Sequence, residues 1–182
     1  MKFSWKLCLI IIAVIITVAL LFVFAFQGVQ NTAIGLEEQI TTAQSGIKIQ
    51  EKRRADLIPN LVDCVKAYDE HEYSTLMAVI EARGSGSDDV ASEVMASVNV
   101  VAEQYPELKS SENYKQLMTE LATTENLIAN TRNNYNTWVT KYNSYVKKFP
   151  NRGILDMLGY EVQVFEKLTY DVSSDAPTNL FG

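Results

Sequence analysis

The stretch YKQLMTELATTENLIANTRNNYNTWVTKYNSYVKKF, from Tyr114 to Phe149, decides the fold. Its apolar and aromatic positions alternate steps of three and four residues without a break, as on one face of an α-helix. They are Tyr114, Leu117, Leu121, Thr124, Ile128, Thr131, Tyr135, Trp138, Tyr142, Tyr145 and Phe149. About five heptads of this kind predict a long helix that packs along a bundle or coiled-coil seam. Pro150 and Gly153 predict where it ends.

The chain before this helix keeps helical spacing from Leu36 to Leu61, and two polar residues, Gln50 and Arg54, lie on that seam. Pro59 predicts a kink or break near Leu57-Ile58, because proline removes a backbone donor and crowds the preceding turn.

Three further segments are also expected to be helical. One extends from Leu61 to about Arg83, and another from Val90 to Tyr105, with Ser87 or Asp88 as its N-terminal cap. A short amphipathic segment is expected from Ile154 to about Leu168. No strand pattern competes with these helices.

The N-terminal part contains an uninterrupted apolar run, LCLIIIAVIITVALLFVFAF, from Leu7 to Phe26. As a helix it would cover about 30 Å, the hydrocarbon thickness of a bilayer. The run is longer than a signal-peptide core and ends in phenylalanines rather than small residues, so we expect an uncleaved single-pass helix. Lys2 and Lys6 precede the run, which favours a cytoplasmic N-terminus and an external domain, with the reverse topology left open.

The predicted fold class is all-α: a single N-terminal transmembrane helix followed by an antiparallel up-and-down bundle of about four long helices. The expected divisions are a short basic N-terminus (1–6), the transmembrane helix (7–26), the helical bundle (27–172) and a disordered tail (173–182).

Charge restricts the partners of the domain. Removing Lys2 and Lys6 from the 16 basic residues leaves 14 against 22 acidic residues, a balance of −8. This excess argues against nucleic acid or anionic lipid as the main ligand, because both require clustered Lys and Arg. Lys52-Arg53-Arg54 and Lys147-Lys148 are short basic clusters that can still act locally.

Two groups of polar residues are candidate sites. Around Arg53, Arg54, Asp56 and Asn60, an arginine on a bundle seam needs a carboxylate or carbonyl partner, and the long helix offers Glu120 and Glu125. The structural interpretation is an ion pair that fixes helix register. The functional interpretation is an anion-binding arginine that faces a cleft.

The second group repeats after one heptad, as Tyr135-Asn136 and Tyr142-Asn143. In the simpler interpretation the tyrosines pack while the asparagines flank them. In the alternative they form a polar and aromatic ledge for a partner helix or an extended peptide.

Catalytic and metal-binding patterns have little support. The single histidine, His71, has no glutamate three residues before it, as di-iron bundles require, and no glycine-rich phosphate loop occurs. We expect no catalytic residue, no metal and no cofactor.

Several short motifs, in order between about Ile47 and Phe165, resemble the LemA family. They are Arg53-Arg54, Asp56-Leu57-Ile58-Pro59-Asn60-Leu61-Val62, Val65-Lys66, Tyr68, His71-Glu72, Ala82-Arg83, Tyr105-Pro106-Glu107-Leu108-Lys109, Glu112-Asn113, Leu121, Thr124-Glu125-Asn126, Ile128-Ala129, Tyr135-Asn136, Tyr142-Asn143, Phe149-Pro150-Asn151 and Gly159-Tyr160. The resemblance implies a bacterial membrane protein with an N-terminal transmembrane helix and an antiparallel helical bundle, and no established enzymatic activity. One difference is that family members usually carry a tryptophan shortly before the two arginines, where this chain has Gln44-Ser45-Gly46-Ile47.

The predicted function is that of a non-enzymatic interaction or scaffold protein at the bacterial cytoplasmic membrane. Its expected partners are the lipid bilayer, through residues 7–26, and a protein partner or a second copy of the chain, with no nucleic acid. The alternative is a sensor that binds a small molecule or metal at the Arg53/Arg54 and Glu120/Glu125 region.

Overall fold

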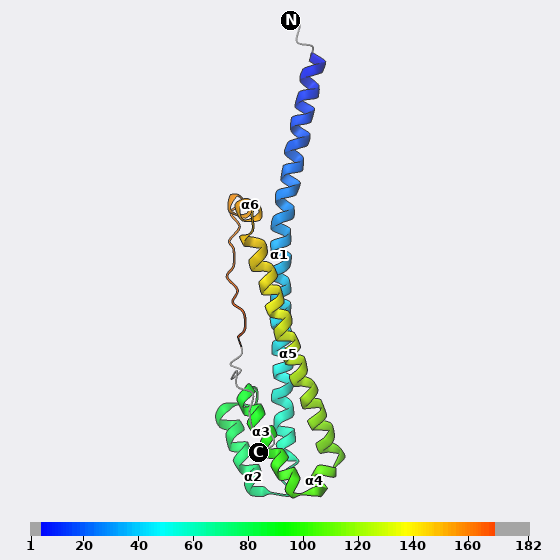
Figure 1. Ribbon diagram of the computed structural model, residues 1–182, viewed down its shortest axis with the longest axis vertical. Helices are drawn as coiled ribbons and strands as arrows, with labels where there is room; N and C mark the ends of the chain where they lie inside the picture. Colours follow the sequence, from blue (N-terminus) through cyan, green and yellow to red (C-terminus); the bar gives the residue numbers. More distant parts are fainter. Residues whose placement is uncertain (1–4, 170–182) are drawn as a thin grey trace, which may run out of the picture. The chain divides into compact units, whose positions relative to one another are not determined.

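The computed structural model describes residues 5–169, and these form six helices with no strand among them. The all-α fold class is confirmed. The helices are α1 (Trp5–Asp63), α2 (Glu70–Arg83), α3 (Asp88–Gln104), α4 (Pro106–Ser110), α5 (Glu112–Lys147) and α6 (Asn151–Met157) (Figure 1). The expected disordered tail, 173–182, and most of the basic N-terminus lie outside the described residues.

The chain divides into two compact units. One comprises residues 41–135, and the other comprises residues 1–40 together with 136–182. The long helices α1 and α5 each contribute to both units.

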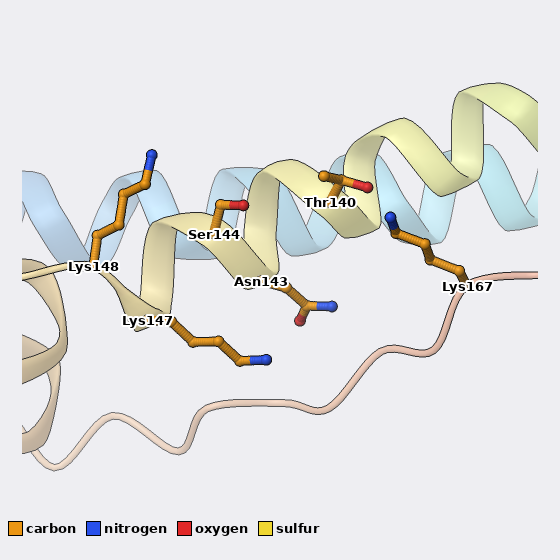
Figure 2. Close-up of a pocket in the computed structure, with 6 residues that line it drawn as sticks. All are labelled: Thr140, Asn143, Ser144, Lys147, Lys148 and Lys167. Carbon is orange, nitrogen blue, oxygen red and sulfur yellow. The ribbon is translucent and has the colours of Figure 1, made fainter.

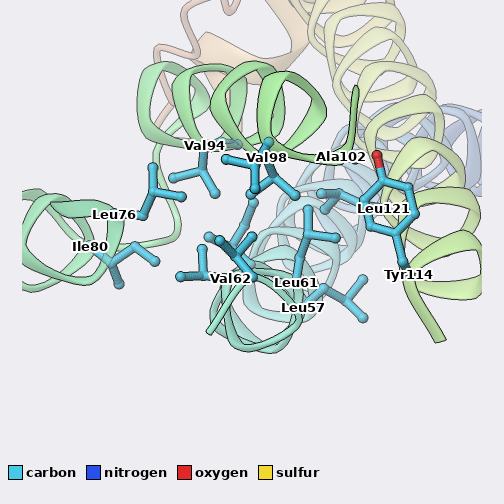
Figure 3. Close-up of a cluster of buried hydrophobic side chains, with 14 of the residues drawn as sticks. Leu57, Leu61, Val62, Leu76, Ile80, Val94, Val98, Ala102, Tyr114 and Leu121 are labelled. Carbon is cyan, nitrogen blue, oxygen red and sulfur yellow. The ribbon is translucent and has the colours of Figure 1, made fainter. Parts of the chain in front are cut away.

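In the unit of residues 41–135, aliphatic side chains from five helices, α1 to α5, form the core (Figure 3). Leu61 and Val62 of α1 pack with Leu76 of α2, Val98 of α3 and Leu121 of α5. All five side chains are almost completely buried. Leu61 and Leu121 are positions of the predicted helical seams, so burying these seams accounts for part of the packing.

The predicted break at Pro59 is wrong, because α1 continues through it to Asp63. Proline cannot donate the hydrogen bond that the Ala55 carbonyl would otherwise accept. Instead, the Ser85 hydroxyl, from the loop between α2 and α3, donates to the Ala55 carbonyl at 2.8 Å. A residue 30 positions away in sequence thus satisfies the group that the proline leaves unpaired.

This replacement predicts an energetic coupling between Ser85 and Pro59. Ser85→Ala should lower the free energy of unfolding by about 1 kcal/mol, because the Ala55 carbonyl loses its extra donor. In a Pro59→Ala background the amide of residue 59 can donate to the Ala55 carbonyl. Ser85→Ala should then lower the free energy of unfolding by clearly less. Urea unfolding of the four proteins of this double-mutant cycle measures the difference, and equal costs in both backgrounds would contradict it.

Three other boundaries differ from the sequence-based predictions. The second helix begins at Glu70 rather than near Leu61, because the Asp69 side chain caps it by accepting from the Glu72 amide. The seam of α5 does not reach Phe149, which is 93% exposed, and Val139 and Val146 are buried in its last turns instead. The segment expected to be helical from Ile154 to Leu168 is helical only to Met157 and is irregular from Tyr160.

The predicted cap of α3 is confirmed as Ser87, whose hydroxyl accepts from the Val90 amide. The connection from Gly84 to Ser87 is short, and Gly84 has φ 79°, a left-handed conformation that favours glycine. This loop brings Ser85, Gly86 and Asp88 against α1, where the first candidate site lies.

Candidate functional site: an arginine cluster and an asparagine ledge

Arg54 is the centre of the first candidate site, in the unit of residues 41–135. Its side chain is 1% exposed, although it carries a charge. The Nη1 atom lies 2.7 Å from Asp88 and 3.2 Å from Glu125, and Nη2 donates to the Gly86 carbonyl. Because the guanidinium contacts both α5 and the loop before α3, it fixes both to α1.

A second arginine completes an arginine cluster, which we define as Glu51, Arg54, Asp88, Glu125 and Arg132. Arg132 of α5 donates to both carboxylate oxygens of Asp88, at 2.7 and 3.1 Å, and to Glu51 at 2.8 Å. Asp88 therefore bridges the two guanidiniums. Two positive and three negative side chains meet here, so the charge of each arginine is compensated within the cluster.

The cluster shifts the pKa values of two of its members, Asp88 and Arg132. Hydrogen bonds from Arg132, and then from Arg54, hold the pKa of the Asp88 carboxyl below its usual value, despite the opposing effect of burial. The hydrogen bond to Asp88 raises the pKa of Arg132 further above its ordinary range.

The lowered pKa of Asp88 predicts a pH dependence of stability. An unfolded aspartate titrates near about pH 3.9, so the contribution of Asp88 should be complete above about pH 5 and be lost as the pH falls through its lower native pKa. An Asp88→Asn variant should accordingly be less stable than the unmodified protein at neutral pH, and its stability should depend less on acid. Thermal unfolding over a range of pH measures both effects. Asp89→Asn, at the exposed neighbouring residue, is the control and should retain the acid sensitivity of the unmodified protein.

The other residues predicted for this site lie at its edge. Arg53 is half-exposed and pairs with Glu120 at 2.6 Å. Asp56 forms an exposed pair with Lys52 one turn earlier, and the Asn60 side chain donates to the Asp56 carbonyl of its own helix. The predicted partners Glu120 and Glu125 are therefore divided between the two arginines, and Asp56 and Asn60 are not brought into the cluster.

Two buried polar atoms, Arg54 Nε in the cluster and Gln50 Oε1 one helical turn earlier on α1, have no hydrogen-bond partner among the described residues. The described part of the chain also holds no group of three His, Cys, Asp or Glu residues that could bind a metal ion. Since both guanidiniums are already paired with carboxylates, the sensor alternative is not favoured.

The second candidate site lies on α5 in the other unit, and we call Asn136, Tyr142 and Asn143 the asparagine ledge. An extended segment, residues 160–169, runs along it, and we call this segment the strap. The Asn136 side chain both donates to the Leu168 carbonyl at 2.9 Å and accepts from the Leu168 amide at 2.8 Å. The Asn143 side chain donates to the Phe165 carbonyl at 3.0 Å.

The spacing of the ledge matches the geometry of the strap. Seven residues of helix advance about 10.5 Å, and three residues of extended chain advance about 10 Å. Asn136 and Asn143 are seven residues apart, and their partners Leu168 and Phe165 are three apart. Both asparagines contact main-chain atoms of the strap, so they recognise an extended backbone rather than particular side chains.

Tyr142 contacts the strap at Gln163 and Phe165, on the N-terminal side of Leu168. Its ring is fully buried and packs edge-on against Phe165, with ring centres 5.2 Å apart. Its hydroxyl accepts from the Gln163 amide at 3.0 Å and donates to Glu37 of α1 at 2.7 Å. The Tyr160 hydroxyl donates to the same Glu37 oxygen, which ties the start of the strap to α1.

Burial, and then the hydrogen bond to Glu37, raises the pKa of both Tyr142 and Tyr160. An ordinary tyrosine is already protonated at neutral pH, and the raised pKa values keep both hydroxyls protonated to higher pH. The fourth predicted residue, Tyr135, is buried and belongs to the unit of residues 41–135.

Several residues of these sites were not predicted. Sequence reasoning considered Asp88 only as a helix cap, gave Glu51 no role in the site and did not name Arg132. For the ledge it missed Glu37, Tyr160 and the strap itself. The usable signal for the strap was the sequence Tyr160-Glu161-Val162-Gln163-Val164. Apolar and polar residues alternate in it, which is typical of extended chain.

Comparison with known proteins identifies the family. The family model described as "LemA family" matches residues 43–179, which include both the arginine cluster and the ledge. This chain belongs to the LemA family. "Protein LemA" of Metamycoplasma hominis is 30% identical over 159 residues, which cover 80% of this chain and 73% of that protein.

Two magnetosome proteins match shorter parts of the chain. "Magnetosome protein MamQ 2" of Paramagnetospirillum magneticum is 32% identical over 76 residues, covering 42% of this chain and 28% of that protein. "Magnetosome protein MamQ" of Magnetospirillum gryphiswaldense is 32% identical over 65 residues, covering 36% of this chain and 24% of that protein. None of the printed names of these relatives states an enzymatic activity, so the comparisons give no support for a catalytic role.

Proposed function

We propose that this LemA family member is a membrane-anchored, non-enzymatic scaffold whose asparagine ledge binds an extended segment of a protein partner. Anchoring is supported by α1, the one described helix that is long and apolar enough to cross a bilayer. Every residue from Leu9 to Ala25 is exposed, so none of the described residues covers this surface. The favoured topology has a cytoplasmic N-terminus and an external domain at the bacterial cytoplasmic membrane.

The observation that carries the scaffold role is the recognition of main chain by Asn136 and Asn143. Side chains that bind backbone amides and carbonyls accept many sequences, as in peptide binding by strand addition. In the described structure the strap of the same chain occupies the ledge. A partner segment, from another protein or a second copy, binds by replacing the strap and making the same hydrogen bonds.

Photo-crosslinking in intact cells tests this role. A photoreactive residue at Thr140 or Ser144, both exposed beside the strap, should crosslink to a recurrent partner. The crosslink should be lost in an Asn136→Ala/Asn143→Ala variant, because the partner then loses its main-chain contacts. It should persist in an Asn126→Ala/Asn134→Ala variant, which removes two exposed asparagines from the same helix.

Two differently tagged copies in the same cell separate self-association from a different partner. Crosslinks between the tags would identify the partner as a second copy. The proposal would be wrong if the probe crosslinked only to the strap of its own chain, in the unmodified protein and in both variants. The ledge would then make only an intramolecular contact.

A further inference from the structure

The end of α5 and the helix α6 form a tip, residues 145–157, that lies next to the apolar part of α1. The Tyr145 hydroxyl donates to the Val29 carbonyl of α1 at 3.3 Å. Val29 is three residues beyond Phe26, where the apolar run ends, a distance of about 4.5 Å along a helix. Both residues belong to the same compact unit.

The chain after Tyr145 continues toward the apolar run. Tyr142 contacts Glu37 and Tyr145 contacts Val29, so α5 moves toward the N-terminus of α1 as its residue numbers rise. The Asn151 side chain donates to the Tyr145 carbonyl at 3.1 Å, which holds the start of α6 at the same level (Figure 1). The tip therefore lies where α1 would leave a membrane.

Two large apolar side chains of the tip are uncovered. Phe149 is 93% exposed and Met157 is 75% exposed, whereas Leu155 of α6 is completely buried and fixes that helix to the unit. Exposed aromatic and long apolar side chains next to a membrane-spanning helix are suited to the headgroup region, where part of the surroundings is apolar.

The tip is also basic in an otherwise acidic protein. Residues 145–157 contain three basic side chains, Lys147, Lys148 and Arg152, and one acidic side chain, Asp156, a balance of +2, although the chain after the apolar run has a balance of −8 (14 basic and 22 acidic residues). Lys147 and Lys148, with Lys167 of the strap, line a shallow depression of about 400 Å³ beside α5 (Figure 2). Its other lining residues, Thr140, Asn143 and Ser144, add hydrogen-bonding groups.

We propose that the tip is a second membrane contact, which binds the bilayer surface beside α1. Phe149 and Met157 enter the headgroup region, and Lys147, Lys148 and Arg152 bind the phosphates of anionic phospholipids. The partner is the bilayer because apolar and basic groups occur together at the level where the apolar run ends. This inference rests on the proposed anchoring by α1.

Spin-label depth measurements on the full chain test the tip and the anchor separately. In a Cys8→Ala/Cys64→Ala background, single cysteines at Phe149, Met157, Ile15 and Val100 carry the label. The protein is placed in vesicles of equal parts phosphatidylcholine and phosphatidylglycerol, and collisions with oxygen and with a water-soluble nickel complex are compared. Ile15 reports on the anchor, and Val100 is an exposed apolar residue on α3 in the other unit.

The expected ratio of oxygen to nickel collisions is highest at Ile15, lowest at Val100 and intermediate at Phe149 and Met157. A high ratio at Ile15 with ratios at Phe149 and Met157 equal to that at Val100 would overturn the tip contact and leave the anchor intact. A low ratio at Ile15 would overturn the anchor, and the tip contact with it.

Charge substitutions test the lipid headgroups. Each lysine near an anionic surface strengthens binding by roughly fivefold, so Lys147→Gln/Lys148→Gln should weaken the contact by about 25-fold. The ratio at Phe149 should then fall toward that at Val100, as it should in vesicles of phosphatidylcholine alone. Lys109→Gln/Lys115→Gln, at two exposed lysines of the other unit, should leave the ratio unchanged. If the ratio at Phe149 responded to neither the lysine pair nor the lipid charge, the headgroup assignment would be wrong.

Discussion

Arg54→Ala is expected to lower the free energy of unfolding of the unit of residues 41–135 by roughly 2–3 kcal/mol. The substitution removes the guanidinium that contacts Asp88, Glu125 and the Gly86 carbonyl, and it leaves a cavity between α1, α5 and the loop before α3. The loss stays below that of a fully buried ion pair, because Asp88 and Glu125 keep partial access to water. Urea unfolding of the full chain, with amide exchange in α3, measures it.

Arg53→Ala is the matched control, because Arg53 is the adjacent arginine but is half-exposed and pairs only at the surface, with Glu120. Its expected cost is below about 1 kcal/mol. Arg54→Lys should fall between the two, since a lysine keeps the charge but cannot reproduce the fork of donors. Equal costs for Arg53→Ala and Arg54→Ala would show that the arginine cluster does not hold this unit together.

Tyr142→Ala should have the largest effect in the unit that contains the strap, a loss of about 3–4 kcal/mol. The substitution empties a fully buried site and removes the packing on Phe165, together with the hydroxyl that contacts Glu37 and Gln163. We expect the strap to detach. The amide of Gln163 should then exchange with solvent at the rate of an unprotected peptide, as measured by hydrogen–deuterium exchange.

Tyr142→Phe separates packing from hydrogen bonding. It keeps the ring against Phe165 and removes only the hydroxyl, so about 1–2 kcal/mol should be lost and the strap should stay in place. Faster exchange at Gln163 with unchanged exchange at Leu168 is the expected pattern, because Asn136 still accepts from the Leu168 amide. Full protection of Gln163 in Tyr142→Ala would show that the ledge does not retain the strap through this residue.

The sequence was sufficient for the helices because their seams are local and periodic. The steps of three and four from Tyr114 to Tyr142 predict α5, and the spacing from Leu36 to Leu61 predicts the domain part of α1. The break that was one of the two outcomes predicted at Pro59 does not occur, and the Ala55 carbonyl accepts from Ser85, a partner that only the folded chain brings close. Local rules describe the cost of a proline, and tertiary contacts decide whether the helix continues.

The candidate sites were predictable to a similar extent. A buried arginine requires an acid, so Glu125 could be named in advance, whereas Asp88 reaches Arg54 only through the conformation of a short loop. The heptad spacing of Asn136 and Asn143 suggested a ledge for a helix or an extended peptide. The spacing did not show which segment binds the ledge. The strap binds through main-chain atoms, which every residue has, so its sequence gives no specific signal.

The same main-chain contacts have an evolutionary consequence. A backbone held by asparagine side chains places few demands on the residues that supply it, so we expect exposed strap positions such as Glu161 and Val164 to change from one species to another. Asn136 should not change, because its side chain both donates to and accepts from Leu168, and no other side chain offers a donor and an acceptor at the same length. In LemA family sequences with this geometry, the strap should drift while Asn136 is retained.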